Sequence, residues 1–256
     1  MRVTGERVVT RAGGFNPTFQ RHVAAYALCA ELLPPGRVLD LGCGIGHSFK
    51  LLAPRETVGV DADPGALAGQ ERETHVGDMR DLALPDGSFA SVVCIQAIEH
   101  VPDPSRVTAE VDRVLELGGV AVFVTPNRLT FARPDEIIDP YHYAEYDAEQ
   151  LRALCGATFP KVEMHGIFGS ERYLELVGEE RAKLDALLAK DPLRLRRLLP
   201  RRVKQRLYDR RLATERRQSD DRPELIGVGD FELRSEGLEH CLDVVAVCRS
   251  AVASGS

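Results

Sequence analysis

Short apolar runs alternate with longer amphipathic segments over most of the chain. The short runs predict buried strands at residues 37–41, 57–61, 74–76, 89–95, 119–125, 161–167 and 242–248. The amphipathic segments predict helices at residues 16–34, 46–53, 64–72, 103–117 and 147–156. Strands that alternate with helices in this way favour an α/β fold, in which a mostly parallel sheet carries helices on both faces.

The same pattern divides the chain into successive parts. Residues 36–168 hold most of the alternating strands and helices, and we expect them to form the α/β core. The other expected parts are an N-terminal helical cap at 1–35, a helical, Arg-rich insertion at 169–229, the last strand of the core at 230–249 and a flexible tail at 250–256.

Residues 38–46 read VLDLGCGIG, an apolar run followed by a glycine-rich turn and a helix-forming stretch. A buried strand, a glycine turn and a helix N-terminus together form a cradle that a ligand can approach closely. The dinucleotide-binding fingerprint requires a glycine at the position of His47, so the spacing is G-x-G-x-G rather than G-x-G-x-x-G. We therefore expect a ligand without a pyrophosphate.

Further polar signals follow the next predicted strands. Asp61 ends the second strand about twenty residues after the glycine turn, where a carboxylate can accept both hydroxyls of a ribose. Asp78 and Met79 follow the third strand, and a Pro-Asp-Gly turn at 85–87 precedes the fourth. These acids predict a nucleoside site.

The order LDLGCGIG, VGVDADP, VGDMRDLALPDGSF, AIEHVPDP and LELGGVAVFVTPN resembles class I S-adenosylmethionine (SAM)-dependent methyltransferases, over about residues 36–168. The resemblance extends to the methyltransferase families of the ubiquinone pathway. It implies a Rossmann-like sheet of seven strands, the last one antiparallel, and SAM as the cofactor. The alternative is a Rossmann-like domain that uses the same residues only as turns and caps.

The resemblance also implies which residues contact SAM. The backbone of the glycine turn and Asp40 would face the methionine part, Asp61 with Ala62 would hold the ribose, and Asp78 would accept the adenine amino group beside Met79. His22 and Tyr26, one turn apart on the N-terminal helix, either close over SAM or pack against the core. The full expected set is His22, Tyr26, Asp40, Gly42, Cys43, Gly44, Gly46, Asp61, Ala62, Asp78, Met79 and Gln96.

Methyl transfer is an in-line displacement, so the protein must align the acceptor and help to remove a hydroxyl proton. Glu99 and His100 follow the predicted strand 89–95, and His142 stands among tyrosines after the next strand. In one mechanism His142 or His100 is a general base near neutral pH. In the other, Glu99, His100 and His142 hold a divalent cation, Mg²⁺ or Mn²⁺, that activates the hydroxyl.

The Glu-His pair and the later histidine resemble metal-dependent ubiquinone-pathway O-methyltransferases and plant small-RNA 2′-O-methyltransferases. Those families carry a further glutamate three residues before the pair, where this chain has Gln96. A glutamine is still an oxygen donor but carries no charge. This departure weakens the case for a metal. Mg²⁺ prefers carboxylate and water oxygens, while histidine suits Mn²⁺ or Zn²⁺ better.

Several segments also resemble actinobacterial sugar O-methyltransferases, of the kind that methylates methylmannose polysaccharides. They are residues 4–7, 21–26, 125–131, 139–142 and 230–232. The expected activity is O-methylation of a hydroxyl on a saccharide or another small metabolite. The rivals are an RNA-modifying methyltransferase and a SAM-binding regulator without turnover, and N- or C-methylation is open too, because the nucleophile belongs to the substrate.

Composition supports an intracellular enzyme of one large domain. The chain has 256 residues and a formal net charge of −6, which argues against general nucleic-acid binding. Its six cysteines lack zinc-like spacing and lie mostly in apolar runs, as expected for buried thiols in a reducing compartment. No apolar run is long enough to span a membrane, and the first residues lack the apolar middle of a signal peptide, so we expect a cytoplasmic protein.

Charge is unevenly distributed. Residues 190–222 contain thirteen Lys or Arg against five Asp or Glu, a net +8, and the rest of the chain carries −14. We favour a solvated helical lid or homodimer arm whose arginines pair with acids of the core. Contact with an anionic membrane or a lipid-linked substrate is the next alternative. An RNA-binding patch is the third, and Tyr208 as the only aromatic residue in this stretch argues against it.

Overall fold

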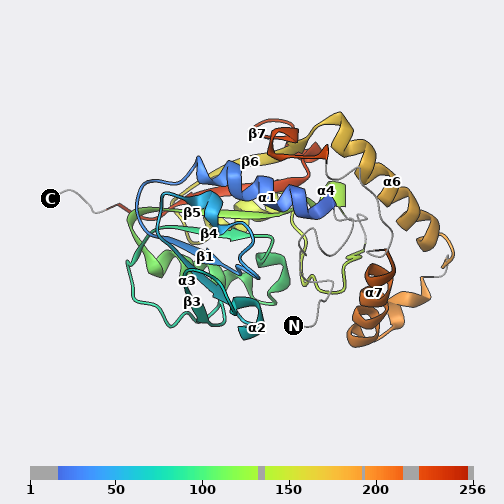
Figure 1. The fold of residues 1–256 in the computed structure, drawn as a ribbon, viewed down its shortest axis with the longest axis horizontal. Coiled ribbons are helices and arrows are strands. Elements are labelled where there is room, and N and C mark those ends of the chain that lie inside the picture. The colour runs from blue at the N-terminus through green and yellow to red at the C-terminus, as the bar shows by residue number, and fades with distance from the viewer. Residues whose placement is uncertain (1–16, 132–135, 192–193, 216–224, 253–256) are drawn as a thin grey trace.

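The computed structural model describes residues 17–131, 136–191, 194–215 and 225–252, which fold around an eight-stranded sheet (Figure 1). The strands follow one another across the sheet in the order β3-β2-β1-β4-β5-β8-β6-β7. Their bounds are β1 Val38–Leu41, β2 Thr57–Asp61, β3 Glu73–Val76, β4 Phe89–Ile95, β5 Leu115–Pro126, β6 Lys161–Gly169, β7 Phe231–Arg234 and β8 Asp243–Arg249.

The sheet is mostly parallel, as the sequence predicts. β1 pairs in parallel with β2 and β4, β3 pairs in parallel with β2, and β5 in parallel with β4. β8 lies antiparallel between β5 and β6. The antiparallel last strand and the Rossmann-like arrangement are therefore confirmed.

The expected number of seven strands is wrong by one. Residues 230–249 contain β7 as well as β8, and β7 pairs antiparallel with the end of β6 at the edge of the sheet. Phe231 is buried and Leu233 packs beside it in the same core, while Glu232 and Arg234 alternate with them. β7 reads FELR, in which apolar and charged residues alternate, so it contains no apolar run of the kind that predicts the other strands.

Helices cover both faces of the sheet. A hydrophobic core forms on each face because successive side chains of a strand point to opposite sides. In β4, Val93 and Ile95 pack with α1 (Pro17–Ala30) and α6 (Glu171–Leu188) on one face. Val92 and Cys94 pack with α3 (Pro104–Val114) and α5 (Ala148–Gly156) on the other. The helices are α1 Pro17–Ala30, η2 Phe49–Leu52, α2 Pro64–Leu67, η3 Ile98–His100, α3 Pro104–Val114, α4 Arg128–Phe131, α5 Ala148–Gly156, α6 Glu171–Leu188, η4 Leu195–Leu198, α7 Arg201–Glu215, η6 Val228–Asp230 and η7 Leu238–His240.

Four predicted helices are shorter than expected. The helix predicted at 16–34 ends at Ala30. The segment 46–53 forms only the 3₁₀ turn η2, and 64–72 forms only α2, after which Gly69 turns the chain with a φ of +80°. The segment 103–117 ends as a helix at Val114, and Leu115 already belongs to β5, where it pairs with Phe89. In the last case pairing with a neighbouring strand overrides the local helical pattern.

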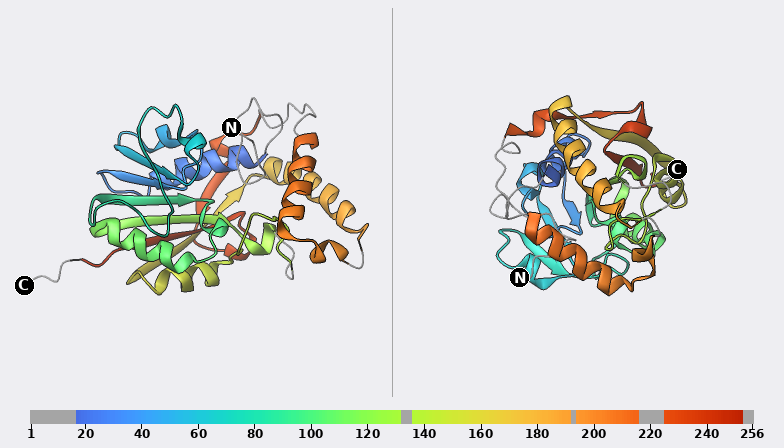
Figure 2. Two further views of the ribbon diagram at one scale, coloured as in Figure 1. Left: turned by 90° about the horizontal axis from the view of Figure 1, so that it is seen from below. Right: turned by 90° about the vertical axis from the view of Figure 1, so that its right-hand side faces the viewer.

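The insertion places helices α6 and α7 beyond one end of the sheet, as Figure 2 shows. α7 packs against the loop after α4: the Tyr208 hydroxyl donates to Asp139 at 3.0 Å, and the Tyr141 hydroxyl donates to Asp209 at 2.9 Å. Arg201 donates to the carbonyl oxygens of Pro140 and Tyr141 at 2.9 and 2.8 Å. The loop at 139–146 is therefore held from outside by the insertion.

All six cysteines are free and buried, as their apolar surroundings predict. Among the described residues, no helix is both long enough and apolar enough to cross a membrane. The segment 4–7, which contributed to the sugar-methyltransferase likeness, residues 192–193 and 216–222 of the basic stretch, and residues 253–256 of the predicted tail lie outside the described residues.

Candidate functional site

A cavity of about 300 Å³ opens at the carboxyl ends of β1, β2 and β4, where open α/β sheets bind their ligands. Its volume lies at the lower end of the usual range for small-molecule sites. The wall consists of His22, Gly42, Cys43, Gly44, Ile45, His47, Val60, Asp61, Ala62, Gly77, Asp78, Met79, Arg80, Ile95, Gln96, Ala97, His100, Val101 and Pro102.

The glycine turn forms one side of this cavity because its backbone is bound to β2. The amides of Gly42 and Cys43 both donate to the carbonyl oxygen of Val60, at 2.8 and 3.0 Å. Gly42 has a φ of +74°, and a Cβ there would lie 2.5 Å from that of Ala97. Only glycine permits both this conformation and this close approach to the segment after β4.

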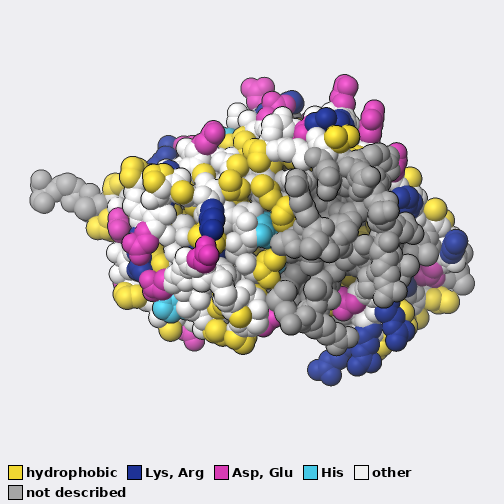
Figure 3. All heavy atoms as spheres, in the orientation of Figure 1, with side chains coloured by type: hydrophobic (Ala, Val, Ile, Leu, Met, Phe, Trp, Pro, Cys, Tyr) yellow, Lys and Arg dark blue, Asp and Glu magenta, His cyan; other side chains and the backbone are white. Residues whose placement is uncertain are grey.

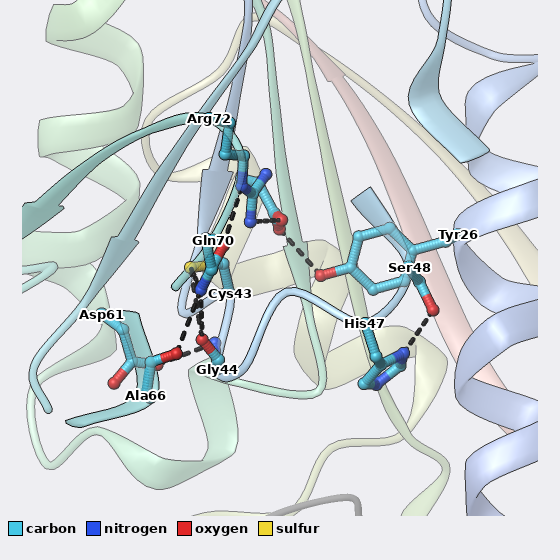
Figure 4. A network of polar contacts seen from close by, with 10 residues as sticks. Tyr26, Cys43, Gly44, His47, Ser48, Asp61, Ala66, Gln70 and Arg72 are labelled. Carbon is cyan, nitrogen blue, oxygen red and sulfur yellow. Dashed lines mark hydrogen bonds and ion pairs between the residues drawn. The ribbon is translucent and has the colours of Figure 1, made fainter. Parts of the chain in front are cut away.

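Asp61 lies on the cavity wall and also fixes the glycine turn. One of its oxygens accepts a hydrogen bond from the amide of Gly44 at 2.9 Å (Figure 4). The other accepts one from the amide of Asp63, also at 2.9 Å. A carboxylate held by two backbone amides has a set orientation, and lone pairs remain for further donors. The position of Asp61 is consistent with the expected contact to a ribose diol.

Asp78 also lies on the cavity wall, after the neighbouring strand β3, and is paired with Arg80. The guanidinium of Arg80 donates to the two carboxylate oxygens, at 2.9 and 2.6 Å. Hydrogen bonds from Arg80 lower the pKa of Asp78, so the carboxylate is ionised at neutral pH. A ligand amino group at this point would share the carboxylate with Arg80, a residue that sequence reasoning did not include.

Asp40 does not line the cavity, which differs from its expected contact with the methionine part of SAM. Its buried carboxylate lies beneath the glycine turn, where the Tyr26 hydroxyl donates to it at 2.8 Å and Arg72 at 2.7 Å. Figure 4 shows this network, in which Gln70 also donates to the Gly44 carbonyl oxygen at 2.9 Å. Asp40 and Tyr26 therefore support the turn from below.

Rings of histidine and tyrosine gather where α1 meets the cavity. The His22 ring lies 5.3 Å from that of Tyr26 and 4.9 Å from that of His47, and both histidines line the cavity. Burial lowers the pKa of His22 to about 3 and that of His47 to about 4. The two imidazoles are thus neutral at physiological pH, and a cationic ligand would meet no positive charge from them. His47 is not among the cofactor residues expected from the sequence.

Gln96 is held in an unusual conformation at the inner end of the cavity, with a φ of +49°. Its backbone amide donates to Val124 at 2.7 Å, and its side-chain amide donates to Asp243 at 3.1 Å. Asp243 also forms a buried ion pair with Arg21 of α1 at 3.1 Å. A non-glycine residue at positive φ is costly unless its surroundings hold it, and these contacts come from two strands and a helix.

The three predicted catalytic residues lie together. Ligating atoms of Glu99, His100 and His142 all lie within 4.8 Å of one another, although Glu99 and His142 are far apart in the sequence. His100 lines the cavity, and its ring lies 4.9 Å from that of His142. Glu99 is buried and accepts the Thr125 hydroxyl at 3.0 Å. The cluster therefore adjoins the cavity on the side of β4 and β5.

His142 is oriented by a carboxylate. Its Nδ1 lies 3.1 Å from Oε1 of Glu145, so Nε2 is the nitrogen that can accept a proton. Burial lowers the pKa of His142, but the hydrogen bond to Glu145 and the charges of Glu99 and Asp139 outweigh it, so the pKa is raised above 6.5. Glu145 orients the ring in the way that a carboxylate orients the histidine of a catalytic triad.

Of the expected cofactor residues, nine line the cavity and three do not. Asp40 and Tyr26 lie beneath the glycine turn, and Gly46 lies behind it against Gln70. Arg72, Gln70 and Arg80 were not expected. Asp40 lies inside an apolar strand, which indicates that a buried cationic side chain neutralises it. The sequence does not say which one, because the chain has 33 Lys and Arg residues.

Comparison with known proteins identifies the family. Residues 39–123 match the family described as "Methyltransferase domain". The chain is 35% identical over 183 residues to the protein named "Probable S-adenosylmethionine-dependent methyltransferase Rv3030" of Mycobacterium tuberculosis, covering 68% of this chain and 67% of that protein. This chain belongs to the SAM-dependent methyltransferases.

The fold of the methyltransferase agrees with solved structures of this kind. It is similar to a Thermotoga maritima protein described as a SAM-dependent methyltransferase and "possible histamine N-methyltransferase", with a TM-score of 0.58, 17% identity and 90% of each chain covered. It is also similar to Haemonchus contortus phosphoethanolamine N-methyltransferase 2, which was solved with SAM, with a TM-score of 0.55, 18% identity, and 92% of this chain and 57% of that one covered. SAM is accordingly the cofactor, and we expect it in the cavity described above.

The first prediction concerns the buried ion pair of the methyltransferase. Asp40→Asn should lower the free energy of unfolding by about 3–5 kcal/mol, because it leaves the Arg72 charge buried without a counter-charge. Tyr26→Phe removes one donor and should cost less, about 1–3 kcal/mol. Urea denaturation followed by circular dichroism measures both. An Asp40→Asn variant as stable as the wild type would contradict the support assigned to this pair.

The second prediction concerns SAM binding. Asp61→Asn should weaken SAM binding by roughly 2–3 kcal/mol, since it removes charge-assisted hydrogen bonds to the ribose. Asp63→Asn is the matched control, because Asp63 lies two residues further on, outside the cavity wall, and caps α2, where asparagine serves equally well. Titration calorimetry should show a large loss for the first variant and little for the second. Equal affinities would refute the ribose assignment.

Proposed function

We propose that the methyltransferase transfers the methyl group of SAM to a hydroxyl oxygen, with His142 as the general base. The observation that supports this proposal is the position of His142: a carboxylate holds its Nδ1, its pKa is raised, and its ring adjoins that of His100 on the cavity wall. An alcohol is a weak nucleophile until its proton is removed, and a base with a pKa near the working pH does this best.

The remaining groups would complete the mechanism. The methyl group leaves the sulfonium in line with the attacking oxygen, so the acceptor hydroxyl must lie between the cavity and His142. Nε2 of His142 would take the hydroxyl proton, and Glu145 would stabilise the resulting imidazolium. The buried carboxylate of Glu99 adds to the negative charge that favours this protonated form. The imidazolium would lose its proton to solvent after the methylated product leaves.

We further propose a saccharide or another small hydroxylated metabolite as the acceptor. The support is the likeness of segments 125–131 and 139–142 to sugar O-methyltransferases, together with the placement of 139–142 beside His100. Incubation with methyl-labelled SAM and saccharide fractions should yield alkali-stable methyl ethers. Label that appears only in amines would contradict an oxygen acceptor, and label that appears only in RNA would contradict a saccharide or small-metabolite acceptor.

A divalent cation is a second candidate for the same cluster. Two imidazole nitrogens and one carboxylate oxygen within 4.8 Å form a donor set that suits Mn²⁺ better than Mg²⁺. Glu99, His100 and His142 would hold the ion, and when bound it would lower the pKa of a coordinated hydroxyl. His142 would then be a ligand and could not serve as the base.

The third prediction separates His142 from a structural role. Since only the neutral imidazole accepts a proton, kcat/KM should rise with pH through a pKa above 6.5. His142→Gln should lower kcat by roughly 10²–10⁴-fold and abolish this rise, and SAM affinity should not change. His75→Gln, at a half-exposed histidine of β3, is the control. Full activity in His142→Gln would remove it from the mechanism.

The fourth prediction separates the base from the cation. With His142 as the base, turnover in excess EDTA should stay within about twofold of the untreated rate. Calorimetric titration with Mn²⁺ should then show no binding at this cluster, so that the wild type and His100→Gln give the same result. Loss of turnover in EDTA, recovery with Mn²⁺, and Mn²⁺ binding that His100→Gln removes would replace the base with the cation site.

A further inference from the structure

The segment 194–210, which contains η4 and the described side chains of α7, is strongly basic. It carries eight Lys or Arg residues and a single acid, Asp209. Lys and Arg side chains gather at the lower right of Figure 3, at the position that α7 occupies in Figure 1. The remainder of the molecule is acidic, so this concentration of positive charge has a definite place on the surface.

One side of α7 is already occupied. Arg201, Tyr208 and Asp209 contact the loop at 139–143, and the Arg201 guanidinium lies 3.5 Å from the centre of the Tyr143 ring. These three residues lie on the side of α7 that packs against the loop before His142.

The other side of α7 is exposed, as are Leu195 and Leu198 of η4, and we call this surface the basic face. At 100° per residue, Arg202, Arg206 and Arg210 form one stripe along the helix, with Val203 and Leu207 beside them. All five are exposed. Within the part of the chain that the structure describes, Arg202 and Arg206 form no hydrogen bond or ion pair.

The basic face also carries large apolar side chains in solvent. Leu198 is 82% exposed, Leu195 58% and Leu207 51%. The expectation that the arginines of this stretch pair with acids of the core holds for Arg196 and Arg197, which reach Glu136. Arg202 and Arg206 make no such pair among the described residues. Exposed leucines scattered singly are common on protein surfaces, but here they lie in the same segment as these two arginines.

We infer that the basic face docks on an anionic lipid bilayer. Apolar side chains that enter the headgroup region, flanked by arginines that contact lipid phosphates, are the features of an interfacial helix. The negative surface potential of the bilayer makes the binding free energy of each arginine more favourable, and burial of the leucines in the headgroup region adds to it.

Two other occupants fit less well. Single-stranded RNA needs aromatic platforms, and the only aromatic residue in this segment, Tyr208, uses its hydroxyl on Asp139. A second copy of the chain placed face to face would bring two strongly basic segments together, and like charges oppose such a contact.

The fifth prediction tests docking with the full chain and without turnover, so it stands apart from the proposed reaction. Vesicles of phosphatidylcholine with about one third phosphatidylglycerol should sediment the protein at about 0.1 M salt, and pure phosphatidylcholine vesicles should not. Arg202→Glu with Arg206→Glu should weaken binding at least about tenfold, and higher salt should weaken that of the wild type.

Matched controls keep this test specific. Lys161→Glu with Arg249→Glu makes the same change in charge at the amino ends of the central strands and should leave vesicle binding unchanged. Leu198→Ser with Leu207→Ser should reduce vesicle binding without changing any charge. SAM affinity equal to that of the wild type shows that each variant is folded.

Four results would overturn the inference. The first is that the wild type does not sediment with anionic vesicles, and the second is that the Lys161 and Arg249 control loses as much binding as the Arg202 and Arg206 variant. The third is that the protein binds poly(U) RNA more tightly than vesicles. The fourth is that sedimentation equilibrium shows a dimer, which the Leu198 and Leu207 substitutions dissociate. The third would assign the basic face to RNA, and the fourth would assign it to a homodimer.

Discussion

The buried ion pair between Arg72 and Asp40, together with the Tyr26 hydroxyl, is the contact on which the cofactor site depends. It joins β1, the segment before β3 and α1 at one point beneath the glycine turn. Each ion loses several kcal/mol of hydration when buried, so neither is stable there without its partner. The three elements must therefore assemble together. The turn above them receives its shape from this base and from the Val60 carbonyl oxygen.

This arrangement produces a cavity whose charges suit a sulfonium nucleoside. Asp61 and Asp78 supply ionisable carboxylates on its wall, and His22 and His47 remain neutral because burial depresses their pKa values. A positively charged ligand would thus meet negative groups, uncharged rings and one cation, Arg80, which is paired with Asp78. A second cluster adjoins this region, where Glu145 orients His142 beside His100, and in the proposed reaction the acceptor hydroxyl is activated there.

The insertion connects this second cluster with the surface. Its inner side holds the loop that carries His142, and its outer side presents the basic face. Arg201 and Tyr208 of α7 hold that loop through Pro140 and Asp139, so a ligand on the basic face would be linked to the loop through one helix. The same helix thus supports the loop that carries His142, the proposed base, and presents the proposed docking surface.

Most strands of the sheet and the main residues of the candidate site can be predicted from the sequence alone. The short apolar runs predict every strand of the sheet except β7, the glycine turn and the acid after the second strand mark the cavity, and Glu99, His100 and His142 are recognisable as a group. These features are local, or they follow from the rule that parallel strands end at one edge. Only the tertiary structure shows that Asp40 lies beneath the turn and that Arg72 neutralises it. It also shows that His47 faces the cavity and that residues 115–117 belong to β5. Those outcomes depend on contacts between residues distant in sequence, and many charged or apolar residues could satisfy the same local pattern.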